Sequence, residues 1–293
     1  MTSRLSTAKR RVPTASRLVW EPTSDGLRRR PDELAVEEPL EIRLSRPGGG
    51  TEVLTVTMRT PGNDFELAAG WLLGEGIVSG PADLQALRYC TDPELDAEQR
   101  YNVVTVDLSE PARAALGEVP ARLGLTSSSC GVCGTASIEL LEQRGLRAVA
   151  SEATFSLGDV LGWPELLREN QAAFTATGGL HAAGLVSAAG ELLVAREDIG
   201  RHNAVDKVIG WALREAIEQR GVFPLAELGL VVSGRSSFEI VQKALAAGIP
   251  LVAGVSAASS LAARLADEQG LTLAGFVRGG RATIYAHPER LSS

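Results

Sequence analysis

The sequence contains few cysteines and few aromatic residues. Only three of its 293 residues are cysteine, which is too few for a disulfide framework and suits a reducing compartment. Aromatic residues make up 4% of the chain, whereas hydrophobic residues as a whole make up 44%. A large core must therefore be built from Ala, Val, Leu and Ile. The 31 glycines indicate many positions where the backbone turns sharply or approaches another group closely.

Long uninterrupted apolar segments are also missing. The longest run without a charged residue spans residues 244–263, and Gly248, Pro250 and Gly254 interrupt it. We expect a buried helix, a turn, a strand and a second helix there rather than a membrane span. Arg10 and Arg11 are not followed by the apolar segment of an export signal. These absences predict a soluble, cytoplasmic protein that does not contact the membrane.

The formal net charge of −7 is unevenly distributed. Residues 1–30 contain eight basic and two acidic side chains, so this arm carries +6 and the remainder of the chain carries −13. Its Pro, Ser and Thr content predicts a solvated, disordered arm, with an electrostatic contact to an acidic partner as the alternative. The acidic remainder disfavours nucleic-acid binding.

The pattern between residues 31 and 125 predicts a small α+β domain. Apolar residues alternate with polar ones over 40–44 and 54–58, on either side of three consecutive glycines, which is typical of a β-hairpin. Thr60 and Pro61 open a predicted helix that ends near Gly74, and residues 101–108 are a predicted strand.

The remainder, residues 126–293, has the pattern of a second α/β domain. Predicted strands at 228–232, 249–255 and 271–277 alternate with predicted helices, which favours parallel βαβ units. Upstream, Asn203 is a predicted N-cap of a helix that reaches about Gln219.

Residues 126–134 join the two parts and contain Cys130 and Cys133 in a Cys-x-x-Cys spacing. Serines and glycines around the pair predict a mobile loop. The spacing permits half of a zinc site, a dithiol switch, a sulfur-carrier site or a structural pair. A zinc site would need further ligands, and the candidates are isolated in the sequence: Cys90, His181, His202 and His287.

Five motifs are distributed along the chain: Ser129–Gly134, Thr177–Ala183, Glu197–Lys207, Ser233–Arg235, and Gly279–Thr283 leading to His287 and Pro288. Together they resemble the FdhD family of formate dehydrogenase accessory sulfurtransferases. The similarity runs in one unbroken order from about Glu38 to Leu291, and the basic arm lies outside it.

This resemblance implies a fold and a function. The fold would be α/β, with a C-terminal cytidine-deaminase-like three-layer domain containing a mixed sheet, preceded by the smaller α+β domain. The protein would be a sulfurtransferase that accepts persulfide sulfur from a cysteine desulfurase. It would pass that sulfur to the molybdenum cofactor, as bis-molybdopterin guanine dinucleotide, before the cofactor enters formate dehydrogenase. A homodimer and binding of GDP as a surrogate ligand are also implied.

The resemblance also assigns residues. Cys130 would carry the persulfide, with Cys133 assisting, and no metal would be bound. The cofactor-binding stretch is Phe276, Val277, Arg278, Gly279, Gly280 and Arg281. The residues favour this independently, because guanidinium groups beside glycines at the end of a parallel strand suit a phosphate-bearing ligand.

Other motifs leave more than one interpretation open. The Ser233–Ser236 turn could present a helix N-terminus to a phosphate. Ionisable and polar side chains also gather within ten residues of each other. They form a capped helix with local ion pairs, a second wall of the cofactor site, or a group of cations that favours the cysteine thiolate: Asp198, Arg201, His202, Asn203, Asp206 and Lys207. His181 is either a core residue or a site residue, and Cys90 is expected to be a buried small hydrophobe. The alternative functions are a non-catalytic molybdenum-cofactor chaperone and, third, a zinc-dependent deaminase-like hydrolase.

Overall fold

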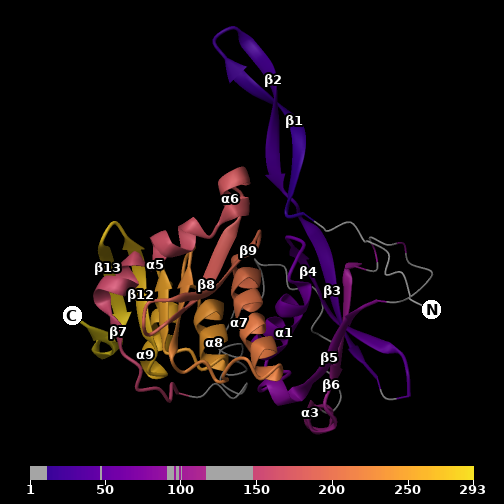
Figure 1. Ribbon diagram of the computed structural model, residues 1–293, viewed down its shortest axis with the longest axis vertical. Helices are drawn as coiled ribbons and strands as arrows, with labels where there is room; N and C mark the ends of the chain where they lie inside the picture. Colours follow the sequence, from indigo (N-terminus) through magenta and orange to yellow (C-terminus); the bar gives the residue numbers. More distant parts are fainter. Residues whose placement is uncertain (1–11, 47, 91–95, 97–98, 100, 117–147) are drawn as a thin grey trace.

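The computed structural model describes residues 12–46, 48–90, 96, 99, 101–116 and 148–293. Two β-sheets lie on opposite sides of a layer of helices (Figure 1). The larger sheet is mixed, with the strand order β13-β12-β11-β10-β8-β9. Its strands are β8 (His181–Ser187), β9 (Leu192–Asp198), β10 (Leu228–Val232), β11 (Leu251–Gly254), β12 (Thr272–Arg278) and β13 (Arg281–Ala286).

Helices cover both faces of the larger sheet. Along β10, Leu230 and Val232 pack into one apolar cluster whereas Val231 packs into another, because successive strand side chains point to opposite faces. The first cluster contains α7 (Arg201–Ile217), α8 (Phe238–Ala246) and α9 (Ser260–Glu268), and the second contains α5 (Leu157–Glu169). The predicted α/β class, three layers and mixed sheet are therefore confirmed.

The smaller sheet has the strand order β4-β3-β6-β5. Leu40, Ile42 and Leu44 of β3 point inward, toward helix α1. Its elements are β3 (Glu38–Ser45), β4 (Thr51–Arg59), α1 (Asp64–Gly74), β5 (Leu84–Tyr89) and β6 (Val103–Leu108). Short elements complete the described chain: η1 (Pro81–Asp83), α3 (Glu110–Leu116), β7 (Phe155–Ser156), α6 (Ala172–Thr177), η2 (Pro288–Arg290) and β14 (Leu291–Ser292).

Helices α1 and α7 pack against each other through paired glycines. A Cβ atom at Gly70 would lie well under 3.0 Å from the backbone of Asp206, and one at Gly210 would lie equally close to the backbone of Glu66. Real side chains essentially never come this near to a backbone atom. The absence of a Cβ at both positions is thus what allows the two helices to touch and the two sheets to share one core.

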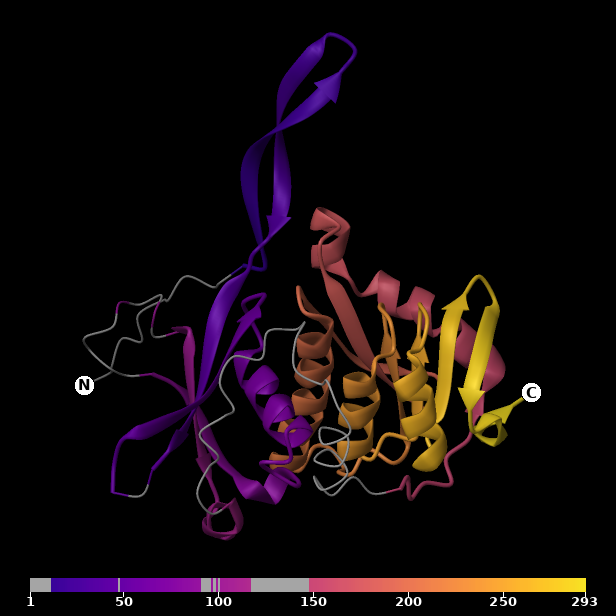
Figure 2. The same ribbon diagram turned by 180° about the vertical axis from the view of Figure 1, so that it is seen from behind.

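The N-terminal arm differs from the prediction. Instead of being disordered, its described part belongs to a two-stranded hairpin of β1 (Thr14–Thr23) and β2 (Gly26–Ala35), which projects from the body (Figures 1 and 2). The cross-strand register places Arg28 opposite Glu21 and Arg29 opposite Trp20, so charge pairs and a cation–π contact stabilise it. Composition alone does not reveal this pairing. The predicted boundary at residue 30 falls inside β2.

Two predicted helix starts are displaced. Helix α7 begins at Arg201 after an N-cap at Gly200, so Asn203 is not the cap. Helix α1 begins at Asp64, not beside Pro61, because Thr60 is held by Asp198 and Ile199 of the other half of the chain. Such long-range contacts override local start signals.

The uncharged run at residues 244–263 has the predicted order. It contains the end of α8, a turn at Gly248, strand β11 and the start of α9. Across the described ranges, none of the helices combines the length and the apolar character needed to cross a bilayer.

Replacing Gly210 with Ala should lower the free energy of unfolding by about 3 kcal/mol, because the new methyl group meets backbone that cannot move aside. The matched control is Gly162→Ala in α5, where a Cβ meets no atom within 4 Å. This control should raise stability by about 0.5–1 kcal/mol through helix propensity. Denaturant unfolding measures both, and equal effects of the two substitutions would contradict the proposed contact.

Candidate functional site

The carboxyl ends of β10, β11 and β12 lie together at one edge of the larger sheet, because these three strands are parallel. The turns that follow them are joined by backbone hydrogen bonds. Ser256 N–H donates to Gly234 O over 3.2 Å, and Phe276 N–H donates to Ser256 O over 3.0 Å. We call this row of turns the carboxyl edge. Ligands of α/β sheets commonly bind at such an edge.

The predicted cofactor-binding stretch is the tip of the β12–β13 hairpin at this edge. Arg278 lies opposite Arg281 in the strand register, with Gly279 and Gly280 between them at φ 57° and 69°. A Cβ at either glycine would meet no atom within 4 Å, so their backbone is open to a ligand. Both arginines are exposed, and within the described residues neither forms an ion pair.

Phe276 and Val277 have opposite orientations within the same stretch. Val277 is fully buried in the sheet, so its contribution is to the core and not to ligand contact. Phe276 has a left-handed backbone with φ 51°, and its side chain is 39% exposed. A non-glycine residue in this conformation carries a cost of the order of 1 kcal/mol. The exposed ring stands beside Arg278, whose guanidinium carbon lies 5.8 Å from the ring centroid.

Arg201 and Arg235 carry positive charge near His181, at the other end of the carboxyl edge. Gly234 lies next to both His181 and Arg201. A Cβ atom at this glycine would be 3.4 Å from His181 Nδ1 and 3.8 Å from Arg201 Cδ. Burial lowers the pKa of His181, and the charges of Arg201, His202 and Arg235 lower it further. The Arg201 Nε atom is buried and, among the described residues, has no hydrogen-bond partner. This arrangement suits an anion.

The acidic and basic residues of Glu197–Lys207 divide between two roles. Asp198 and Lys207 form a buried ion pair of 2.7 Å, and Lys207 also donates to Thr60 O. Asn203 donates to Met58 O over 2.8 Å and to Asp198 Oδ1 over 3.0 Å. These three residues therefore join the two halves of the chain, whereas Arg201 and His202 lie at the carboxyl edge. The ion pairing predicted for this segment is therefore confirmed, whereas its role as a second wall of the cofactor site stays a prediction.

A hydrogen-bonded chain of side chains connects the starts of α7 and α8. Ser237 Oγ lies 3.1 Å from His202 Nε2, and His202 Nδ1 lies 2.9 Å from Glu239 Oε2. The hydrogen bond from His202 is the main cause of the lowered pKa of Glu239. The sequence patterns single out His202 and the turn at residues 233–236 just before Ser237, but neither Ser237 nor Glu239. Only the crossing of the two helices brings the three together, so no local spacing signals it.

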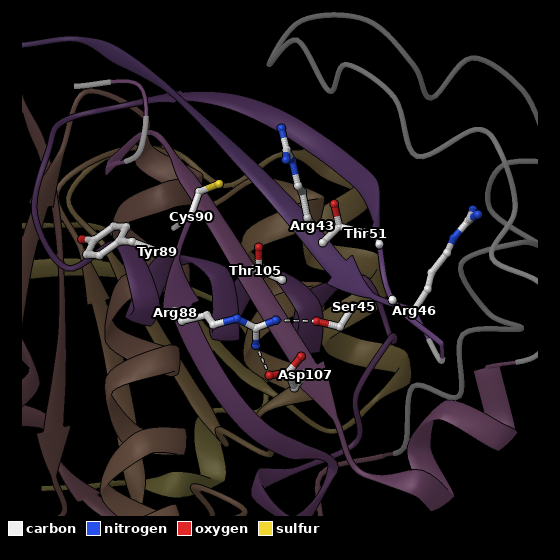
Figure 3. A pocket seen from close by; sticks show the side chains of 11 residues that line it. Arg43, Ser45, Arg46, Thr51, Arg88, Tyr89, Cys90, Thr105 and Asp107 are labelled. Carbon is white, nitrogen blue, oxygen red and sulfur yellow. Dashed lines mark hydrogen bonds and ion pairs between the residues drawn. The ribbon is translucent and has the colours of Figure 1, made fainter. Parts of the chain in front are cut away.

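A pocket of about 490 Å³ lies elsewhere, on the outer face of the smaller sheet (Figure 3). Its arginines are already paired: Arg43 with Glu41, Arg46 with Glu52, and Arg88 with Asp107 and Ser45. Cys90 lines this pocket and is partly exposed, so the expectation of a buried Cys90 is wrong. The strand β5 ends just before it, at the edge of the sheet, where less packing covers the side chain.

Two predicted site residues cannot be placed. Cys130 and Cys133, with the whole 126–134 loop, lie outside the residues that the structure describes. Their assigned roles remain predictions.

The fold and the carboxyl edge define a mixed-sheet α/β protein with a glycine hairpin and a cationic group suited to an anionic ligand. The sequence pattern of the FdhD/NarQ family matches residues 35–292, so this chain belongs to that family.

Similar proteins support the assignment along most of the chain. A "Sulfur carrier protein FdhD" from Nocardia farcinica is 48% identical over 281 residues, covering 96% of this chain and 95% of the relative. One from Streptomyces coelicolor is 46% identical and covers 90% of each. A crystal structure of a putative formate dehydrogenase accessory protein from Desulfotalea psychrophila shares the fold, with a TM-score of 0.72 and 22% identity. It covers 96% of this chain and all of that one.

The buried pair of Asp206 and Lys243, 2.6 Å apart, predicts a pH effect on stability. Burial raises the pKa of Asp206 to about 6, from a usual value near 3.8. The folded state therefore keeps a proton that the unfolded state releases, and this contribution to stability is lost as the pH rises through 6. The free energy of unfolding of the parent, minus that of Asp206→Asn, should fall by up to about 3 kcal/mol from pH 4 to pH 7. Chemical denaturation at each pH measures it, and a flat difference would contradict the raised pKa.

Proposed function

We propose that this protein is a sulfur carrier required for formate dehydrogenase activity. It accepts persulfide sulfur from a cysteine desulfurase and transfers it to bis-molybdopterin guanine dinucleotide before that cofactor enters formate dehydrogenase. Family membership and the sulfur-carrier names of the similar proteins support the carrier role. The observation that carries the acceptor site is the open glycine hairpin between Arg278 and Arg281 at the carboxyl edge.

The hairpin residues fit a guanine dinucleotide as substrate. The two guanidinium groups offer paired donors to phosphate oxygens, and the open glycine backbone lets a phosphate approach the amides. The exposed Phe276 ring offers an apolar face for stacking a base. Arg201 and Arg235 extend the positive charge along the edge, toward which the second half of a large anionic ligand can lie.

Sulfur loading requires a thiolate at Cys130. The thiolate attacks the terminal sulfur of the desulfurase persulfide, a new S–S bond forms, and the desulfurase cysteine leaves as its own thiolate. A free thiol with a pKa near 8.5 is only about 3% ionised at pH 7, so this step needs surroundings that favour the thiolate. Cys133 then assists release of the carried sulfur. The proposed setting is the reducing cytoplasm, where both thiols stay available.

Sulfur loading is tested by incubating the protein with a cysteine desulfurase and cysteine, followed by peptide mass spectrometry. We expect one added sulfur atom at Cys130, in the parent and in the control Cys90→Ala. Cys130→Ala should lose both this modification and the maturation of formate dehydrogenase. Full maturation by Cys130→Ala would favour the cofactor chaperone instead.

Guanine nucleotide binding tests the acceptor site independently of the thiols. Arg281→Ala should weaken GDP binding at least about tenfold, because a charge-assisted hydrogen-bond pair contributes about 1.5–3 kcal/mol. Arg264→Ala is the matched control, since Arg264 is an exposed arginine on α9 that faces Glu268 and lies outside the glycine hairpin in the chain. Calorimetry or fluorescence gives the dissociation constants. Unchanged affinity in Arg281→Ala would remove this residue from the site.

A further inference from the structure

Ser237, His202 and Glu239 are arranged in the order of a nucleophile, a base and an orienting carboxylate. With its proton on Nδ1, His202 donates to Glu239, while its Nε2 accepts from the Ser237 hydroxyl at 3.1 Å. His202 is held between two helices, and its side chain is only 16% exposed. This order of groups is recognised by geometry and not by position in the sequence.

Ser237 uses its hydroxyl differently from the other serine N-caps of the described helices. Ser156 caps α5 by accepting from Asp159 N–H, and Ser259 caps α9 by accepting from Ala262 N–H. Ser237 occupies the same position before α8 but forms no capping hydrogen bond. A missing cap costs about 1 kcal/mol of helix stability. The Ser237 hydroxyl therefore contacts His202 instead of capping the N-terminus of α8.

The first amides of α8 remain available beside this hydroxyl. Within the described chain, the N–H groups of Phe238 and Glu239 donate no hydrogen bond to the backbone or to a side chain. Unpaired amides at a helix N-terminus can stabilise an oxyanion that develops next to them.

Two arginines lie close in the chain to the Ser237–His202 pair. Arg201 precedes His202 on the first turn of α7, and Arg235 lies two residues before Ser237. The positive charge of Arg201 contributes to the lowered pKa of both Glu239 and His181. Glu239 is the acidic residue on the first turn of α8, but the buried Nε atom of Arg201 has no hydrogen-bond partner among the described residues and so keeps a donor for an anion. A substrate with its own negative charge is therefore favoured.

We propose that Ser237 and His202, positioned by Glu239, form a nucleophilic site that hydrolyses carboxylic esters bearing a separate anionic group. The site shares Arg201 and Arg235 with the proposed cofactor surface but uses neither the cysteines nor the glycine hairpin, so labelling at Ser237 is tested independently of persulfide formation at Cys130.

The reaction needs only the ester and water. Ser237 Oγ bonds to the ester carbonyl carbon, and its proton moves to His202 Nε2. The bond to the leaving alkoxide breaks, and that oxygen takes the proton from His202. Water, deprotonated in turn by His202, cleaves the acyl-serine and restores the hydroxyl. No group is oxidised or reduced.

Labelling of the full chain with a fluorophosphonate, followed by peptide mass spectrometry, tests the nucleophile. We expect an adduct at Ser237 that is absent from Ser237→Ala. His202→Ala should label at least about 100-fold more slowly, because the general base is gone. The matched control Ser156→Ala also removes a serine N-cap and should label as the parent does. Failure to label Ser237, or equal labelling rates in the parent and a folded His202→Ala variant, would overturn the proposal.

The positioning role of Glu239 and the preference for anions have their own tests. Glu239→Gln should slow labelling about tenfold, whereas Glu239→Asp should largely restore it; equal rates in both would remove Glu239 from the site. The parent should hydrolyse mono-4-nitrophenyl succinate with a higher kcat/KM than 4-nitrophenyl acetate. Arg201→Ala should abolish this preference. Equal rates for the two esters in the parent would overturn the assignment of an anionic substrate.

Discussion

The contact between α1 and α7 is the constraint on which the rest of the structure depends. Gly70 and Gly210 let the two helix backbones touch, so the smaller sheet can pack through α1 onto the helices of the larger sheet. Buried ion pairs then fix the alignment along this interface, with Lys207 and Lys243 each held by an aspartate. Removing one partner of such a pair leaves a buried charge, which is far more costly than losing a surface contact.

This interface also positions the start of α7. Thr60 holds Asp198, and Asn203 is held by Met58 O, so the chain from β9 into α7 is fixed by residues more than a hundred positions away. Arg201 and His202 are consequently presented at the carboxyl edge, beside Arg235 and Ser237 of the next strand-to-helix turn. The packing of the two halves thus determines the chemistry available at the edge.

Local signals were enough to predict much of the larger sheet. The order of strands and helices from residue 228 to residue 278 follows from apolar runs separated by Gly, Ser and Pro. The same reasoning correctly placed Arg278 and Arg281 around a glycine turn. It failed where partners are distant: the β1–β2 hairpin depends on cross-strand pairs, and Cys90 depends on its place at a sheet edge.

The sequence by itself determined the family and the α/β class. It also indicated the cysteine pair as candidates for sulfur chemistry and the arginines beside the glycine turn as candidates for phosphate binding. The sequence could not decide which residues of the Glu197–Lys207 segment are structural. The same charged side chain forms a buried ion pair or remains available to a ligand, depending on which residues pack against it. Tertiary structure alone made that division, burying Asp198 and Lys207 against Thr60. It also joined Ser237, His202 and Glu239, since only the packing of α7 beside α8 brings side chains 35 residues apart within hydrogen-bond distance.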